Sequence, residues 1–210
     1  LYSGHGLYWP FDGCASNCKF YVPRNSVEAY KSAFGWSEYK NQIVTITTSA
    51  PYTVGDYYCD GEKEGVVFDV WDNGNSGKIL SMTKSASTIQ WASDLTEQNR
   101  LIGANSETDG AVNMAVVKAI SGWESKYPAF KWCADLGEDW YLPAKQELQT
   151  IYNNRTAIDA NLTDVIGTSW YWSSTEYDFQ YSSGEFCAWG VFMFDGDNLS
   201  NSKNYNGYVR

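Results

Sequence analysis

The chain has 210 residues, a formal net charge of −10 at pH 7 and one histidine, and 43% of its residues are hydrophobic. This length allows one large domain, or one domain and a smaller one, to bury a core without disulfide bonds. The negative charge would repel a phosphate backbone, which argues against nucleic acid as a partner. The 16 tyrosines and 10 tryptophans point instead to recognition, because both side chains are enriched where proteins contact ligands.

The five cysteines argue against a disulfide framework and against a four-cysteine zinc site. Their number is odd, and no Cys-x-x-Cys pair occurs. No segment approaches the run of about 20 apolar residues that spans a bilayer. The N-terminus lacks a basic segment followed by an apolar one, so we expect an export signal to lie upstream or to be missing. No membrane insertion is expected in this part of the protein.

The first predicted elements are a short strand and a helix. Residues 19–22 are typical of a strand, which Pro23 closes. Asn25 and Glu28 have the spacing of a helix cap, and Gly35 would end the helix. The residues that we expect to point inward from these two elements are Phe20, Val22, Tyr30 and Phe34.

This segment, CASNCKFYVPRNSVEAYKSAFGWSEYKNQIV (residues 14–44), resembles the last unit of BspA-type bacterial leucine-rich repeats. One repeat cannot bury its own face, so the resemblance implies the end of a longer array or its cap. A run rich in Thr and Ser that ends at Pro51 follows and is typical of a linker or an entering strand. We therefore predict one unit over residues 1–48 and a domain over 49–210. We also expect residues 14–44 to supply no strand to the main sheet of that domain.

The second region alternates strands and helices before it ends in strands. Residues 66–71 and 78–82 are rich in strand formers and flank DNGNSG, which predicts a hairpin. A second helix starts at Pro143, with Leu148, Ile151 and Tyr152 on its inner face. From Ser169 onward the chain is aromatic, Gly-rich and typical of strands. This order predicts an α+β domain. Between the hairpin and Pro143, an amphipathic helix is predicted by the apolar spacing of Val112, Ala115, Val116, Ala119, Ile120 and Trp123.

Four motifs of this region resemble the Lcl C-terminal domain family. They are WYLPAKQELQTIY (140–152), YWSSTE (171–176), AWGVFMFDG (188–196) and YVR (208–210). The family has the C-type lectin-like fold and occurs in bacterial surface proteins, so the resemblance implies an extracellular or cell-surface location. It also implies that the final strands and loops form a ligand-facing surface. The matching scaffold positions are Trp140, Leu142, Pro143, Glu147, Leu148, Trp172, Ser173, Ser174, Glu176, Ala188, Trp189, Val191, Gly196, Val209 and Arg210.

Between these scaffold positions the family often carries arbitrary residues. In members diversified by retroelements, such residues derive from asparagine codons mutated at adenines. The tail of this chain fits that rule, except at Gln180 and Glu185, and so resembles the variable region of a diversity-generating retroelement target. The predicted ligand-binding residues are Tyr177, Asp178, Phe179, Tyr181, Ser182, Ser183, Phe186, Gly190, Phe192, Phe194, Asp195, Asp197, Ser200, Ser202 and Tyr205.

Residues 187–194 form a predicted strand whose two faces are both apolar. Because side chains alternate across a strand, one face carries Trp189, Val191 and Met193. We expect that face to lie against the core. We expect the other face to point outward and to place Phe192 and Phe194 beside Tyr177, Phe179, Tyr181 and Tyr205. The alternative is a central strand that is covered on both sides.

Neither metal nor catalytic chemistry is predicted. The acidic runs WDNGNSG (71–77) and FDGDNLSN (194–201) lack the spacing of a calcium loop and are typical of turns. His5 is the one histidine, so neither a serine triad nor a histidine metal site can be built. Cys133 and Cys187 are interpreted as buried structural cysteines and not as reactive ones. We expect no cofactor, and we expect calcium to be dispensable for folding.

These observations favour a non-catalytic extracellular recognition domain of the adhesin type. It would display an aromatic-rich, variable face to a protein or glycan ligand on a cell surface. The alternative is a structural module whose aromatic face packs on neighbouring domains or subunits. Exposure of the aromatic residues in the isolated chain distinguishes these two hypotheses.

Overall fold

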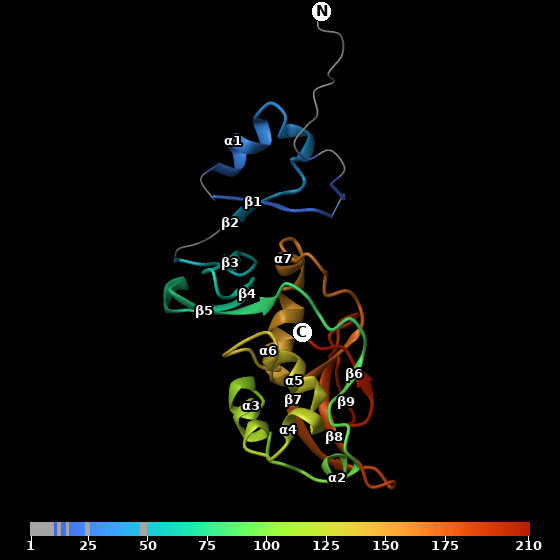
Figure 1. Cartoon of the computed structure of the whole chain (residues 1–210). Coiled ribbons are helices and arrows are strands. Elements are labelled where there is room, and N and C mark those ends of the chain that lie inside the picture. The colour runs from blue at the N-terminus through green and yellow to red at the C-terminus, as the bar shows by residue number, and fades with distance from the viewer. Residues whose placement is uncertain (1–10, 12–13, 16, 24–25, 47–49) are drawn as a thin grey trace, which may run out of the picture.

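The computed structural model describes residues 11, 14–15, 17–23, 26–46 and 50–210. The helix content is 27% and the strand content is 26%, which confirms the expected mixture of α and β structure. The first strands lie toward the N-terminal end of the molecule, and the last strands lie together toward the opposite end (Figure 1).

A five-stranded sheet occupies the first part of the chain. Its strands are adjacent in the same order as they occur in the sequence. The first three are parallel, and a short helix, α1 (Val27–Ser32), connects the first two; the fourth strand is antiparallel to both the third and the fifth. The strands are β1 (Phe20–Pro23), β2 (Ile43–Ile46), β3 (Tyr57–Cys59), β4 (Glu64–Trp71) and β5 (Ser76–Ser81).

This sheet runs across the predicted boundary near residue 48. Ile46 of β2 pairs with Tyr57 of β3, and the Tyr21 ring stacks on Tyr57 at 4.0 Å between centroids. The Tyr21 hydroxyl also donates to the Asn161 carbonyl oxygen at 3.1 Å. The expectation that residues 14–44 supply no strand to the sheet of the following region is therefore wrong. The division of the chain into two domains stays a prediction.

One of the four predicted inward residues of the N-terminal unit is misplaced. Val22 is buried, and Phe20 and Tyr30 are half-buried against the Trp36 ring. Phe34, in contrast, is 86% exposed. The reason is that α1 ends at Ser32 and the next residue is extended, so Phe34 does not continue the helical period.

The predicted hairpin is confirmed as β4 and β5. The two strands pair from Gly65 with Ser81 to Trp71 with Ser76, and a short 3-10 turn (Asp72–Gly74) joins them. Asp72, Asn73 and Gly74 all have positive φ angles. Asn and Gly tolerate that conformation best, which is why the DNG run forms the turn.

Six described helices follow, namely α2 (Leu95–Gln98), α3 (Gly110–Lys118), α4 (Trp123–Lys126), α5 (Pro128–Ala134), α6 (Lys145–Asn153) and α7 (Arg155–Asp159). The inner face predicted for α6 is confirmed, because Leu148 and Ile151 are buried and Tyr152 is half-buried, but the predicted start at Pro143 is wrong, because Ala144 is extended and the helix begins at Lys145. Within the described parts of the chain, no helix has the length and apolar character that a membrane span needs.

The inner face of α3 was predicted incorrectly. The helix exists, but Val112 is 52% exposed, and the buried face carries Asn113, Met114 and Val117. The Asn113 amide donates to the carbonyl oxygen of Ser106 and to the hydroxyl of Ser174. A polar side chain held by these bonds belongs to the inward face, and apolar periodicity does not detect it.

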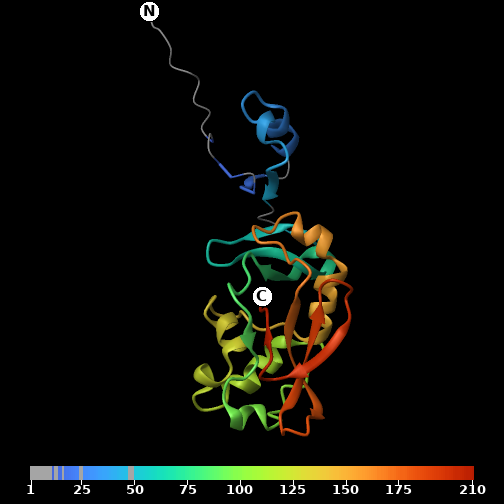
Figure 2. The ribbon, with the colours of Figure 1, turned by 90° about the vertical axis from the view of Figure 1, so that its right-hand side faces the viewer.

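The C-terminal region is β structure, as predicted. A three-stranded antiparallel sheet consists of β7 (Trp170–Gln180), β8 (Phe186–Phe192) and β9 (Asn198–Ser202), with β8 in the centre. These strands lie side by side along one flank of the molecule (Figure 2). A separate short ladder joins β6 (Ile89–Gln90) and β10 (Asn206–Gly207).

Two hydrophobic cores lie against the β7–β9 sheet and explain why β8 is apolar on both faces. The first includes Val191 and Met193 with Leu148 and Ile151 of α6. The second includes Ala188 with the large side chains of Trp91, Tyr127, Phe130 and Trp172. The alternative of a strand covered on both sides therefore holds for the first part of β8.

Candidate functional site

The 15 predicted ligand-binding residues lie on β7, β8 and β9, on the turns between them and, for Tyr205, just after β9. Tyr177, Asp178, Phe179, Tyr181, Ser182, Ser183, Phe194, Asp195, Asp197 and Tyr205 are exposed. Phe186, Phe192, Ser200 and Ser202 are half-buried, and Gly190 is buried. Six of the seven aromatic members form two groups on opposite faces of the sheet, and Phe186 belongs to neither. The structure therefore does not bring them together as one surface.

The first group, which we name the hairpin cluster, consists of Tyr177, Phe179, Tyr181 and Trp189. The Tyr177 ring lies 4.5 Å from Trp189 and 6.2 Å from Phe179, and Phe179 lies 5.4 Å from Tyr181, between centroids. Lys145, the first residue of α6, places its Nζ 4.7 Å from the Trp189 ring centroid. The hairpin cluster is therefore on the face of the sheet that α6 covers, next to the beginning of that helix.

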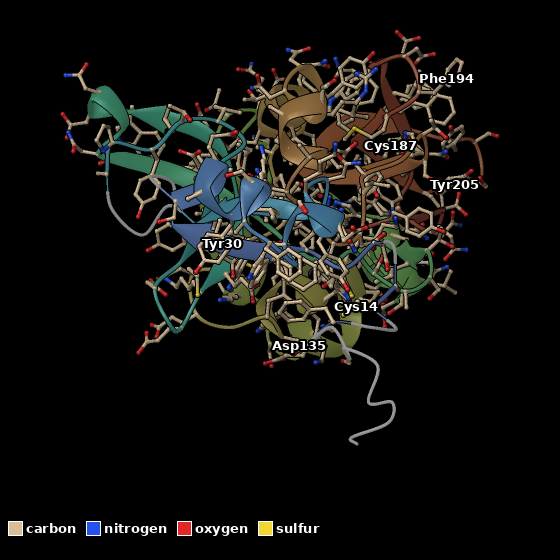
Figure 3. The ribbon with its side chains drawn as sticks, turned by 90° about the horizontal axis from the view of Figure 1, so that it is seen from above. Cys14, Tyr30, Asp135, Cys187, Phe194 and Tyr205 are labelled. Atoms are coloured by element: carbon tan, nitrogen blue, oxygen red, sulfur yellow. The ribbon has the colours of Figure 1, made fainter. Side chains whose placement is uncertain are left out.

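The second group, which we name the platform cluster, consists of Trp170, Phe192, Phe194, Leu199 and Tyr205. Trp170 and Phe192 are partners on the β7–β8 ladder, and Trp170 lies 5.6 Å from the Tyr205 ring. Phe194 is 66%, Leu199 47% and Tyr205 49% exposed. Phe194 and Tyr205 lie along the same outer flank of the sheet (Figure 3). Phe192 points away from α6, because side chains alternate along β8 and the neighbouring Val191 packs against that helix.

Two glycines allow the Trp170 indole to lie over neighbouring strands. A Cβ atom on Gly190 would be 2.4 Å from Trp170 Cζ2, and one on Gly207 would be 2.6 Å from Trp170 Cζ3. Real Cβ atoms do not approach other atoms that closely, so the ring occupies the space that a side chain would need. The expectation that Gly190 faces outward at the surface is therefore wrong, since it is buried beneath Trp170.

The expected neighbourhood of Phe192 and Phe194 was only partly right. Both lie with Tyr205, through Trp170, but not with Tyr177, Phe179 and Tyr181, which are on the other face. Val191 and Met193 are buried as expected. Trp189 is half-buried and belongs to neither hydrophobic core; its ring lies beside the Tyr177 ring and the Lys145 ammonium.

A buried ion pair connects the β7–β9 sheet to the loop before α3, which includes residues 102–104. The Lys203 ammonium is completely buried and lies 2.5 Å from a carboxylate oxygen of Glu176. Glu176 also accepts the backbone N–H groups of Ile102, Gly103 and Ala104 at 2.8 to 3.0 Å. Burial lowers the pKa of Lys203, and the neighbouring Glu176 charge opposes that shift. Nothing in the polar run around Lys203 indicated this pair.

A cleft of about 530 Å³ lies between the β4–β5 hairpin and the segment that connects α5 to α6. Lys63 and Asp139 form an ion pair of 2.7 Å across it, and Lys78 pairs with Glu147 behind it. Sequence reasoning missed this cleft, because its walls come from segments far apart in the chain. The residues that line it include Tyr52, Tyr58, Lys63, Val67, Trp71, Lys78, Ile79, Ser81, Leu136, Asp139, Trp140, Tyr141 and Arg210.

The two cysteines nearest these surfaces have the environment of unreactive thiols. Cys133 and Cys187 are buried, and burial raises the pKa of both thiols. A thiol in that environment is a poor nucleophile, because the thiolate is the reactive form. The described residues contain no group of three or more side chains that could hold a metal ion. His5 lies outside the described residues.

Comparisons with known proteins give this chain no family. No protein-family model matches it, and a search of curated proteins finds no significant match. The resemblance to the Lcl C-terminal domain family and to leucine-rich repeats therefore stays a prediction that rests on the motifs. Function has to be argued from the surfaces described above.

Proposed function

We propose that the chain is a non-catalytic, adhesin-like recognition domain that binds a protein or glycan ligand on a cell surface. In this proposal the ligand contacts the platform cluster, supported by the polar turn residues beside it. The observation that carries the proposal is the group of large apolar side chains that remains open on the flank of the β7–β9 sheet. Exposed apolar patches of this kind mark interaction sites on soluble proteins.

The scaffold supports a C-type lectin-like reading of the domain. Most of the positions that matched the family motifs are buried, which suits framework residues that do not touch ligand. Its last strands carry the exposed aromatic side chains, as the resemblance implies. The buried matching positions are Leu142, Pro143, Glu147, Leu148, Trp172, Ser173, Ser174, Glu176, Ala188, Val191, Val209 and Arg210.

The N-terminal unit supports a repeat-like cap in front of that domain. Phe20 of β1 pairs in parallel with Ile43 of β2, and a helix connects the two strands. Their separation along the chain falls within the period of about 20 to 29 residues that leucine-rich repeats have. A repeat array placed before a recognition domain is consistent with an extracellular or cell-surface location.

The composition of the open flank suits recognition that depends on side chains. Aromatic anchors supply contact area at a low entropy cost, and Ser and Asp provide adaptable hydrogen bonds. Asp195 and Asp197 lie in the exposed turn between β8 and β9, beside Phe194. Substitutions at these exposed positions would leave the cores unchanged, which is what diversification by a retroelement requires.

A binding experiment with matched variants tests the proposal. The fluorescently labelled chain is applied to arrays of glycans and of cell-surface proteins, together with the double variant Phe194→Ser/Tyr205→Ser. An aromatic anchor can contribute about 2 kcal/mol, so we expect the double variant to bind at least roughly 30-fold more weakly. Phe34→Ser is the control, since Phe34 is an exposed phenylalanine of the N-terminal unit. Equal binding by wild type and double variant would exclude the platform cluster as the site.

Self-association distinguishes the alternative, a structural module. Sedimentation velocity over a range of concentrations reports whether the chain forms a dimer. A dimer that Phe194→Ser/Tyr205→Ser abolishes and that Phe34→Ser preserves would show that the platform cluster packs on a second copy. A chain that stays monomeric at all concentrations supports a surface that is open to a ligand.

A further inference from the structure

We propose that the cleft beside β5 binds an extended peptide, which adds to the sheet as a further strand along the open edge of β5. Every residue of β5, from Ser76 to Ser81, lines the cleft. Successive side chains of a strand point to opposite faces, so a cavity over one face would touch only every second residue. A cavity that touches all six therefore reaches the edge of β5, and its contacts with Tyr58 of β3 and Val67 of β4 show that it also extends over the sheet.

The main chain along this edge has almost no partners. β5 is the last strand of the five-stranded sheet and pairs only with β4. From outside that ladder, one bond reaches the main chain of β5 among the described residues: Arg210 Nε donates to the Ser81 carbonyl oxygen at 2.8 Å. An unpaired strand edge presents a row of N–H and C=O groups that can pair with another strand.

The dimensions of the cleft fit one added strand. Six residues of β structure span about 20 Å, and a neighbouring strand lies about 4.7 to 4.9 Å away. The volume of about 530 Å³ is within the range of ligand sites, about 300 to 1,000 Å³. Trp140 and Tyr141 form the opposite wall, where they can contact alternate side chains of the peptide.

One end of the β5 edge is occupied and the other is open, so an added strand can enter from the open end. Arg210 occupies the Ser81 end, because its guanidinium donates to the carbonyl oxygens of Ser81 and Met82. At the Ser76 end, the ladder closes with Trp71, which is 49% exposed. A peptide would therefore enter past Trp71 and pair with residues 76–80.

The lining carries a small excess of positive charge, which disfavours a basic peptide, because Lys63 and Lys78 are paired with Asp139 and Glu147 and Arg210 adds a third cation. Lys63, Lys78 and Arg210 line the cleft together with a single carboxylate, Asp139. Lysine on an edge strand often serves to prevent pairing with other chains. Lys78 does not have that effect here, because its ammonium is bound to Glu147 and leaves the main chain of β5 accessible.

Nuclear magnetic resonance of the ¹⁵N-labelled full chain tests the proposal. The probe is a capped hexapeptide of alternating threonine and valine with one central glutamate. Because recognition through the main chain is independent of sequence, this generic strand should bind at millimolar concentration. We expect it to shift the backbone amide signals of residues 76–80 and to slow their hydrogen exchange. No change in these signals would overturn the proposal.

A second peptide separates main-chain pairing from occupation of a pocket by side chains. The same hexapeptide, methylated on alternate backbone nitrogens along its pairing edge, keeps its side chains but cannot form the ladder. We expect it to leave the β5 signals unchanged. Equal binding of both peptides would contradict strand addition. Methyl glucoside tests whether the cleft is a sugar site instead, and the proposal would be wrong if this sugar shifts the β5 signals and the hexapeptide does not.

Two protein variants complete the experiment. Trp140→Ala removes part of the opposite wall and should weaken hexapeptide binding roughly tenfold. Phe194→Ser lies on the platform cluster, far from this edge in the fold, and should leave hexapeptide binding unchanged. The amide spectrum shows that each variant is folded. Phe194→Ser tests ligand binding at the platform cluster, and Trp140→Ala tests hexapeptide binding at the β5 edge. Each of the two proposals can therefore fail without the other.

Discussion

The platform cluster and the edge of β5 are both open surfaces, but they offer different chemistry. The platform cluster offers large side chains on one face of the β7–β9 sheet. The β5 edge offers main-chain groups in a cleft. Recognition by side chains changes with every substitution, whereas recognition by main chain does not. In these two proposals, the molecule combines one recognition surface that mutation can redirect with one that stays constant.

The largest predicted effect concerns the support of the platform cluster. Lys203→Met leaves the Glu176 carboxylate buried without its cation, and such a loss costs about 3 to 5 kcal/mol. We expect urea unfolding to show this decrease in the free energy of unfolding. The double variant Lys203→Met/Glu176→Gln should recover part of the loss, because no unpaired charge remains. A single variant as stable as wild type would show that the pair does not hold the sheet.

The next effect depends on pH and involves Glu97, which accepts hydrogen bonds from Tyr127 and Arg100 and pairs with Lys126. Burial by itself would raise the pKa of Glu97, but these partners outweigh it and lower the pKa below the ordinary value of 4.5. Its contribution to stability is therefore present above about pH 4.5 and is lost as the pH falls through the lowered value. Glu97→Gln should cost about 1.5 to 3 kcal/mol at pH 7.

The measurement for Glu97 is the free energy of unfolding between pH 7 and pH 3. Wild type should lose stability below about pH 4.5, and Glu97→Gln should show a flatter dependence there. Glu28→Gln is the control, because Glu28 is an exposed residue of α1. Parallel curves for wild type and Glu97→Gln would contradict this role.

A smaller effect tests whether Trp170 needs the glycines beneath it. Gly207→Ala would place a Cβ atom 2.6 Å from Trp170 Cζ3 and 2.9 Å from Trp172 Cδ1. Overpacking of this kind typically costs about 1 to 3 kcal/mol. Combining it with Trp170→Ala should make the two costs less than additive, because the crowding partner is gone. Additive costs in thermal unfolding would show that the ring does not depend on Gly207.

Local sequence patterns predicted the elements that depend on local interactions. The β4–β5 hairpin followed from its DNG turn, α6 from its apolar period, and the final strands from their composition. The errors come from long-range packing. The buried face of α3 is set by hydrogen bonds of Asn113, and the position of Gly190 by the Trp170 ring above it. Periodicity contains no information about either partner.

The candidate sites show the same limit. The predicted residues of the tail are mostly exposed, but the strand register places the hairpin cluster and the platform cluster on opposite faces. A register shift within β7, between Trp172 and Glu176, is not visible in the sequence. The cleft beside β5 depends on Lys63, Trp140 and Arg210 meeting in space. These three residues are far apart in the sequence, so no local sequence pattern could have predicted the cleft.

The smallest predicted effect concerns Phe194 and the stability of the fold. Phe194 is 66% exposed, and the one ring within contact range among the described residues is that of Phe192. Exposed substitutions usually change stability by less than about 0.5 kcal/mol, so we expect Phe194→Ser to unfold at nearly the wild-type urea concentration. The same substitution should weaken binding at the platform cluster, which is the behaviour of a ligand contact. If the variant unfolds early, Phe194 belongs to the support of the sheet, and the difference between the two open surfaces disappears.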